Sequence, residues 1–128
     1  MAYHVSKAKF AQLVERALAE LPEQFADFLE EVPVQIEPRP SRRLLRSLGM
    51  EEDELLLGLY RGANLENRVE VEGFGSPVPN HILIFQDDIE EVSDSEADLV
   101  REVRTTVLHE IGHHFGLDED DLERLGYQ

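Results

Sequence analysis

The chain has 128 residues, a length typical of one domain, and contains no cysteine, which excludes disulfides and cysteine-ligated metals. Acidic residues outnumber basic ones 28 to 12, and the resulting net charge of −16 would repel nucleic-acid phosphates. The N-terminus has no apolar segment typical of a signal peptide, and no apolar run approaches the ~18 residues that cross a bilayer. We therefore expect one soluble, cytoplasmic domain over residues 1–128, with neither nucleic-acid nor membrane partners.

The N-terminal part of the chain predicts helices before any strand. Ser6 is a suitable N-cap for a helix whose apolar residues recur at helical spacing, and Pro22 suits the first turn of a second, short helix. A strand is expected over residues 32–36 and a further short helix over residues 41–47. The basic cluster of the chain falls here, and we interpret it as a solvated helix face rather than a nucleic-acid site. It consists of Arg39, Arg42, Arg43 and Arg46.

The rest of the chain predicts two strands and one long helix, which together indicate an α+β fold. The apolar run 55–60 is interpreted as a buried strand, and the glycine- and proline-rich stretch 61–80 as a loop or loose hairpin. His81–Phe85 is the second clear strand, and at a sheet edge it could bind an extended peptide by strand addition. The polar, acidic residues 86–94 precede a helix that begins near Ser95 and continues through Phe115.

The long helix carries the segment His109-Glu110-Ile111-Gly112-His113. Two histidines four residues apart lie one above the other on a helix, and their imidazoles can bind one zinc ion. Glu110 lies one step around the helix, where it can act as a general base on a metal-bound water. The apolar residues of this helix fall on the face opposite the histidines, which disfavours a purely structural role in the core. They are Leu99, Val100, Val103, Val107, Leu108, Ile111 and Phe115.

A third zinc ligand is expected after a turn at Gly116, three residues beyond His113. Glycine allows a left-handed turn that ends the helix and brings an acidic side chain back toward the metal. Glu119, six residues beyond His113, is the preferred ligand, and Asp118 is the alternative. A last helical segment is expected over residues 118–125.

Three further side chains have two interpretations each. His114 could donate a hydrogen bond near the metal, although a solvated histidine beside such a site is the more frequent case. Tyr60 and Tyr127 could stabilise an oxyanion, but a structural role is the more common one for a tyrosine.

Residues 105–119, Thr105-Thr106-Val107-Leu108 followed by the pattern HExxHxxGxxE, resemble a family of small bacterial zincin-like metallopeptidases, the minimal zincins. The order of the expected elements is also similar. The resemblance implies a small single-domain zincin-like α+β fold with N-terminal helices, a short mixed sheet and a long C-terminal active-site helix. It also implies zinc bound by His109, His113 and a nearby acid, with Glu110 as the base. The family often has Asp where Glu119 stands here, and the methionine turn of the larger metzincins is absent.

The pattern favours zinc-dependent hydrolysis of peptide bonds in a peptide or protein substrate. One alternative is a metal-dependent endoribonuclease, but the bacterial family with similar spacing has a third histidine where Glu119 stands and no glutamate after the first histidine. Another alternative is a non-catalytic binding protein that contains zinc. Such a structural site is usually closed by four protein ligands, whereas only three are found here.

Overall fold

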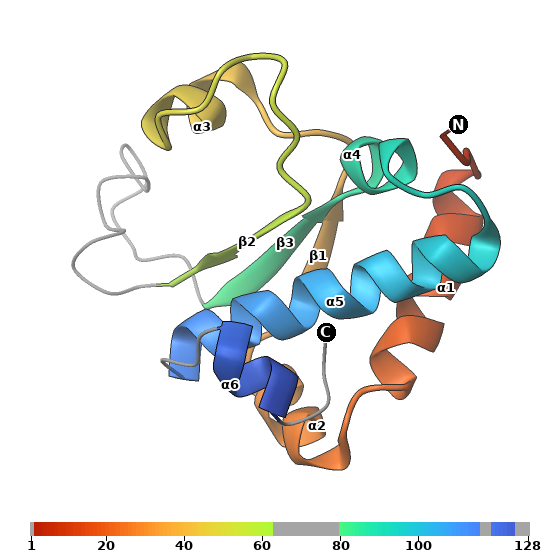
Figure 1. The fold of residues 1–128 in the computed structure, drawn as a ribbon, viewed down its shortest axis with the longest axis vertical. Helices are drawn as coiled ribbons and strands as arrows, with labels where there is room; N and C mark the ends of the chain where they lie inside the picture. Colours follow the sequence, from red (N-terminus) through yellow and green to blue (C-terminus); the bar gives the residue numbers. More distant parts are fainter. Residues whose placement is uncertain (1, 63–79, 116–118, 125–128) are drawn as a thin grey trace.

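The computed structural model describes residues 2–62, 80–115 and 119–124. Helices and a short sheet together form a small α+β fold, as the sequence predicts (Figure 1). In chain order the elements are α1 (Lys7–Ala19), the 3-10 helix η1 (Glu23–Phe25), α2 (Ala26–Glu31), β1 (Val34–Glu37), α3 (Arg42–Ser47), β2 (Gly58–Arg61), β3 (His81–Phe85), α4 (Gln86–Glu91), α5 (Glu96–Phe115) and α6 (Glu119–Arg124). Among the described helices, none combines the length and the apolar character that a bilayer crossing requires.

The sheet is mixed, and its strands lie in the order β1-β3-β2. Strand β3 pairs in parallel with β1 and antiparallel with β2. All five residues of β3 are buried, as expected for a strand with a neighbour on each side. Strand addition to residues 82–85 would require a position at a sheet edge, and the central position of β3 excludes it. Within the described residues the free edges belong to β1 and β2.

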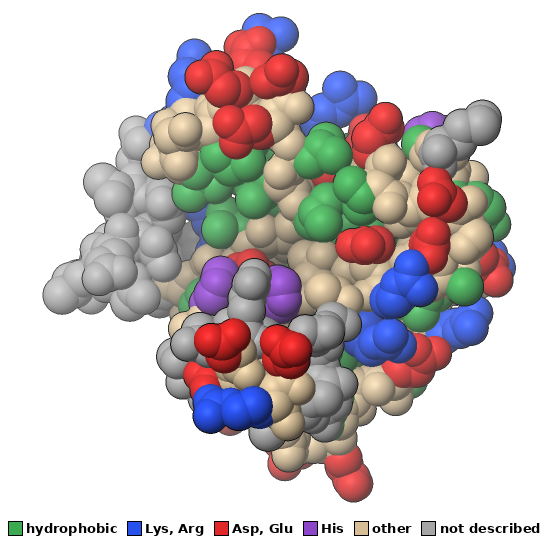
Figure 2. All heavy atoms as spheres, viewed as in Figure 1, with side chains coloured by type: hydrophobic (Ala, Val, Ile, Leu, Met, Phe, Trp, Pro, Cys, Tyr) green, Lys and Arg blue, Asp and Glu red, His purple; other side chains and the backbone are tan. Residues whose placement is uncertain are grey.

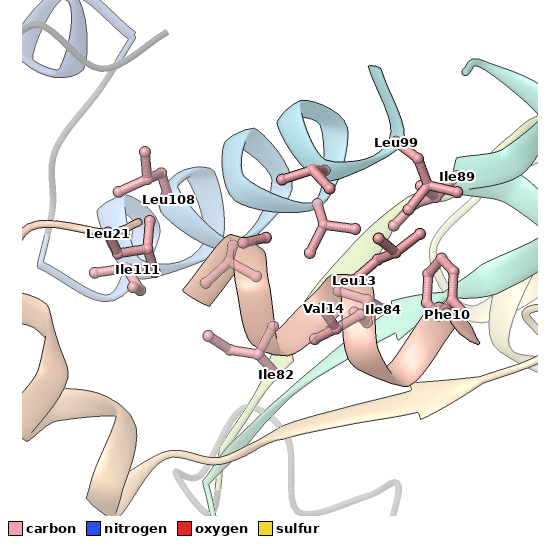
Figure 3. Close-up of a cluster of buried hydrophobic side chains, with 14 of the residues drawn as sticks. Phe10, Leu13, Val14, Leu21, Ile82, Ile84, Ile89, Leu99, Leu108 and Ile111 are labelled. Carbon is pink, nitrogen blue, oxygen red and sulfur yellow. The ribbon is translucent and has the colours of Figure 1, made fainter. Parts of the chain in front are cut away.

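Helices α1 and α5 pack together over one face of this sheet (Figure 1). Figure 3 shows side chains from α1, β3 and α5 meeting in one apolar cluster. The predicted inward face of α5 is confirmed through Ile111, because every apolar position that the structure describes on it is buried. The cluster includes Phe10, Leu13 and Val14 of α1, Ile82 and Ile84 of β3, and Leu99, Val103, Val107 and Ile111 of α5.

Serine caps fix the beginnings of both long helices. The Ser6 hydroxyl accepts a hydrogen bond from the Lys9 N–H at 3.1 Å, and the Ser95 hydroxyl accepts one from the Asp98 N–H at the same distance. Each serine satisfies a backbone donor that has no partner within its own helix. Both caps agree with the sequence prediction.

Helix α4 was not expected, because its sequence is polar and acidic. Several of its polar side chains are nevertheless buried, and Glu90 is the most buried of them, at 3% exposure. Glu90 accepts hydrogen bonds from the Val5 N–H and from Gln86, each at 3.0 Å. The N-terminal segment thus buries α4, and this contact between distant parts of the chain leaves no local pattern in the sequence.

One other expectation is corrected, in the part of the chain between α3 and β3. The predicted strand 55–60 begins only at Gly58, and the Leu55 side chain is exposed. The basic cluster lies partly in exposed ion pairs, Arg39 with Asp87 at 3.3 Å and Arg42 with Glu52 at 3.6 Å. Most of the predicted loop 61–80 lies outside the described residues.

Candidate metal centre

The two motif histidines lie on the C-terminal half of α5, on the side that the core leaves uncovered. The neighbouring Val107 and Ile111 are completely buried. By contrast, His109 is half-buried, and the His113 side chain is 71% exposed. Figure 2 shows histidine side chains at the surface over this part of α5, with hydrophobic side chains across a hollow from them. The pair is therefore accessible from outside the protein.

Glu110 lies between the two histidines in sequence but is much less exposed than His113. Its side chain is 13% exposed, and its Oε1 atom accepts a hydrogen bond from the Tyr60 backbone N–H at 2.7 Å. The Nδ1 atom of His113 is 3.8 Å from the same oxygen, beyond hydrogen-bond distance. Glu110 is thus held by the backbone of β2 rather than by its histidine neighbours.

Burial raises the pKa of the Glu110 carboxyl group above its ordinary value. The Tyr60 N–H and the two histidines act in the opposite direction but do not cancel the effect of burial. A carboxylate with a raised pKa binds a proton more strongly at neutral pH. This property suits a general base.

The hydrogen bond to Glu110 comes from the edge of β2 that faces away from β3. The Phe85 N–H donates to the Leu57 carbonyl at 3.0 Å, and the strands continue antiparallel from this pair with Gly58 opposite Ile84. Because antiparallel residues alternate between pairs that exchange hydrogen bonds and pairs that do not, the polar backbone groups of Gly58 and Tyr60 point away from β3. The Glu110 carboxylate therefore contacts an outward-pointing backbone group of β2.

The predicted third ligands follow α5 in the sequence. Gly116 and Asp118 lie outside the described residues, and Glu119 is described only as the first residue of α6. Among the described residues, no group of three or more side chains has an arrangement that could hold a metal ion. The choice between Glu119 and Asp118 stays a prediction.

The chemistry of the two histidines fits a zinc ion. They lie one helical turn apart on α5, outside its buried face, and within the described residues no hydrogen bond engages either imidazole ring. Neutral imidazole nitrogens are preferred zinc ligands, and an exposed position lets the ion enter. His109 and His113 could thus supply two of the ligands of a zinc centre.

Tyr60, Tyr127 and His114 were the other side chains that the sequence placed near the metal centre. The Tyr60 side chain is half-buried and packs against the core, and burial raises the pKa of its phenol. Its backbone N–H contacts the motif through Glu110. Tyr127 and the side chain of His114 lie outside the described residues.

Sequence reasoning did not find the part that β2 plays in the site. Every residue except proline carries a backbone N–H, so no sequence pattern marks that of Tyr60. Gly58 was a usable signal, because glycine within a strand often marks a close approach of another element. Here that element is α5, which carries the motif.

Comparisons with known proteins agree with the motif. A family model described as zincin-like metallopeptidase matches residues 29–127. A solved structure of a conserved hypothetical protein from Thermus thermophilus is similar to this chain at 28% sequence identity and a TM-score of 0.58. The similarity covers 87% of this chain and 94% of that one. No curated protein matches the chain.

Proposed function

The chain belongs to the zincin-like metallopeptidase family, and from this membership and the site we propose that it hydrolyses peptide bonds with a zinc ion. The observation that carries the proposal is the position of Glu110. Its nearly buried carboxylate lies beside an accessible histidine pair and contacts the edge of β2 that faces away from β3. Metal-assisted hydrolysis needs a metal and a base beside each other, and an adjacent strand edge is one way to bind an extended peptide there.

His109 and His113 would hold the zinc together with one acid after the helix, Glu119 or, as the alternative, Asp118. When bound, zinc supplies a Lewis acid that polarises a carbonyl group and lowers the pKa of water toward ~7. The protein contributes a fixed spacing of the two imidazoles, because both are on one rigid helix that is buried along its other face.

Glu110 would take a proton from the attacking water and pass it to the amine that leaves. Its Oε1 atom is held by the Tyr60 N–H, which fixes the carboxylate in one orientation. This arrangement holds the base in place before the substrate binds.

The substrate would be an extended peptide that lies along the edge of β2 facing away from β3. Outward-pointing backbone groups of β2 lie along this edge, and Glu110 contacts one of them. A strand paired here would bring its own backbone next to the proposed base and the histidines. Backbone pairing provides affinity with little dependence on sequence, so specificity would come from side chains.

A mixed peptide library tests the proposal. Zinc-loaded protein should cleave a subset of the peptides, a chelator should stop cleavage, and added zinc should restore it. His109→Ala should be inactive under all three conditions. Zinc-loaded protein that cleaves no peptide would contradict the proposal and favour a binding protein with zinc, and cleavage of an RNA control instead would favour the endoribonuclease.

A further inference from the structure

Gly58 lies in a position where a side chain would not fit. A Cβ atom at this residue would lie 2.5 Å from the Cγ2 atom of Thr106 and 3.0 Å from the carbonyl oxygen of Leu83. Thr106 belongs to α5 and is itself buried, and Leu83 belongs to the central strand. Strand β2 and helix α5 therefore approach each other more closely at Gly58 than any other residue type would permit.

This close approach is one helical turn from Glu110. Thr106 and Glu110 are four residues apart on α5, a rise of about 6 Å. Gly58 and Tyr60 are two residues apart on β2, a distance of about 7 Å. The two spacings match, so the contact of Thr106 with Gly58 is followed by the hydrogen bond of Glu110 with the Tyr60 N–H.

The length of that hydrogen bond makes it sensitive to the spacing of the two elements. At 2.7 Å the Tyr60 nitrogen and the Glu110 Oε1 atom are already at the short end of the normal range. A Cβ atom at position 58 would push against the buried Thr106 side chain and through it against α5, since the Leu83 carbonyl is fixed within the sheet. Displacing α5 by even a fraction of an ångström moves Glu110 relative to Tyr60.

We propose that Gly58 is a positioning residue for Glu110: its missing side chain lets α5 lie close enough to β2 for the Tyr60 N–H to hold the carboxylate. The proposal rests on the proposed function only in giving Glu110 a catalytic role. The structural part, that Gly58 controls the hydrogen bond between Tyr60 and Glu110, can be measured without any substrate.

The test uses the full chain loaded with zinc and follows amide hydrogen exchange by NMR. Gly58→Ala should accelerate exchange of the Tyr60 amide by about tenfold or more, because that N–H loses its acceptor. The Leu59 amide is an internal control, since the strand alternation turns it toward β3. Its exchange should change much less than that of Tyr60.

A second substitution tests the steric reason. Thr106→Ser removes the Cγ2 atom that a Cβ at position 58 would meet and keeps the hydroxyl group. The double variant Gly58→Ala/Thr106→Ser should therefore recover the slow Tyr60 exchange. Val14→Ala is the matched control for lost stability, because Val14 is buried on α1 and does not belong to the interface of α5 with β2. It should leave the ratio of Tyr60 to Leu59 exchange unchanged.

Peptidase activity provides the functional measurement. Misplacing a reacting group by about 1 Å can cost on the order of 100-fold in rate, so Gly58→Ala should lower kcat by about 10- to 100-fold with a smaller change in KM. The double variant should recover most of the kcat that Gly58→Ala loses. If the native protein cleaves no peptide, the proposed function fails, whereas the exchange measurement still decides the role of Gly58.

Three results would overturn the inference. One is unchanged Tyr60 exchange in folded Gly58→Ala, and another is a folded double variant in which Tyr60 still exchanges fast. If Gly58→Ala alone does not fold, the double variant carries the test, and its failure to fold would also overturn the steric argument. Recovery of folding together with slow Tyr60 exchange would support it.

Discussion

Replacing Glu90 should destabilise the protein, although the residue is far in sequence from the motif. Its carboxylate accepts hydrogen bonds from the Val5 N–H, the Gln86 amide and His4, each at 3.0 Å. The Glu90 side chain is 4% exposed, whereas that of His4 is 70% exposed, so His4 contributes little. Gln86 keeps a second partner, the Val5 carbonyl at 3.1 Å.

The expected cost follows from the donors that lose their acceptor. A buried donor without a partner costs about 1–3 kcal/mol, and hydrogen bonds to charged groups lie at the upper end of their range. In Glu90→Ala the Val5 N–H loses its acceptor and the Gln86 amide loses one of its two. The substitution should therefore lower the free energy of unfolding by about 2–4 kcal/mol. Glu91→Ala is the matched control: Glu91 is exposed on the same helix, and its loss should change stability by less than about 0.5 kcal/mol.

Urea unfolding at pH 7 measures both variants, with unchanged m-values as the sign that only stability differs. The pH dependence gives a second check. Burial alone would raise the pKa of Glu90, but the hydrogen bonds from Gln86, Val5 and His4 outweigh it and lower the pKa below its ordinary value. A carboxyl group with a lowered folded-state pKa stabilises the protein above its unfolded pKa and loses this effect as the pH falls through the folded pKa.

The difference between the native protein and Glu90→Ala should therefore be largest near pH 7 and should narrow in acid, below about pH 4. Equal stabilities at pH 7 would refute the reasoning. A difference that widens in acid would refute the sign of the pKa argument.

Two predictions concern the metal centre. The purified protein should bind about one zinc ion per chain, and His113→Ala should lose it, as measured by elemental analysis. A chelator should lower Tm in thermal unfolding, because a ligand that binds only the folded state stabilises it. A native chain that takes up no added zinc would contradict both expectations. Glu119→Ala should weaken zinc binding more than Asp118→Ala, measured by competition with a chromogenic chelator, and the opposite order would assign the third ligand to Asp118.

Helix α5 was predictable because its signals are local. The cap at Ser95, the apolar spacing and the histidine pair all lie within the helix itself or directly before it, and the structure confirms the cap and the buried face. Residues 55–57 show the limit of such signals. Leucine in succession indicates burial, but whether the run forms a strand depends on which residues find a partner in β3.

The parts that the sequence did not predict depend on contacts between distant segments. Polar residues of α4 can be buried because backbone groups from distant segments satisfy them: the Val5 N–H donates to Glu90, and the Leu56 N–H donates to Asp88. The central position of β3 depends on β1 and β2 pairing with both of its edges. The role of the Tyr60 N–H depends on how closely α5 approaches β2, and Gly58 is the residue in the sequence that indicates this close approach.

The most direct test of the proposed function is Glu110→Gln at equal zinc occupancy. Glutamine keeps the shape of the side chain and can still accept the Tyr60 hydrogen bond, but it cannot take a proton. Since general-base catalysis typically contributes ~10²–10⁴ in rate, kcat on a cleaved peptide should fall by about that factor while bound zinc and KM change little. Equal cleavage by the native protein and Glu110→Gln, with both fully loaded with zinc, would contradict the assignment of Glu110 as the base.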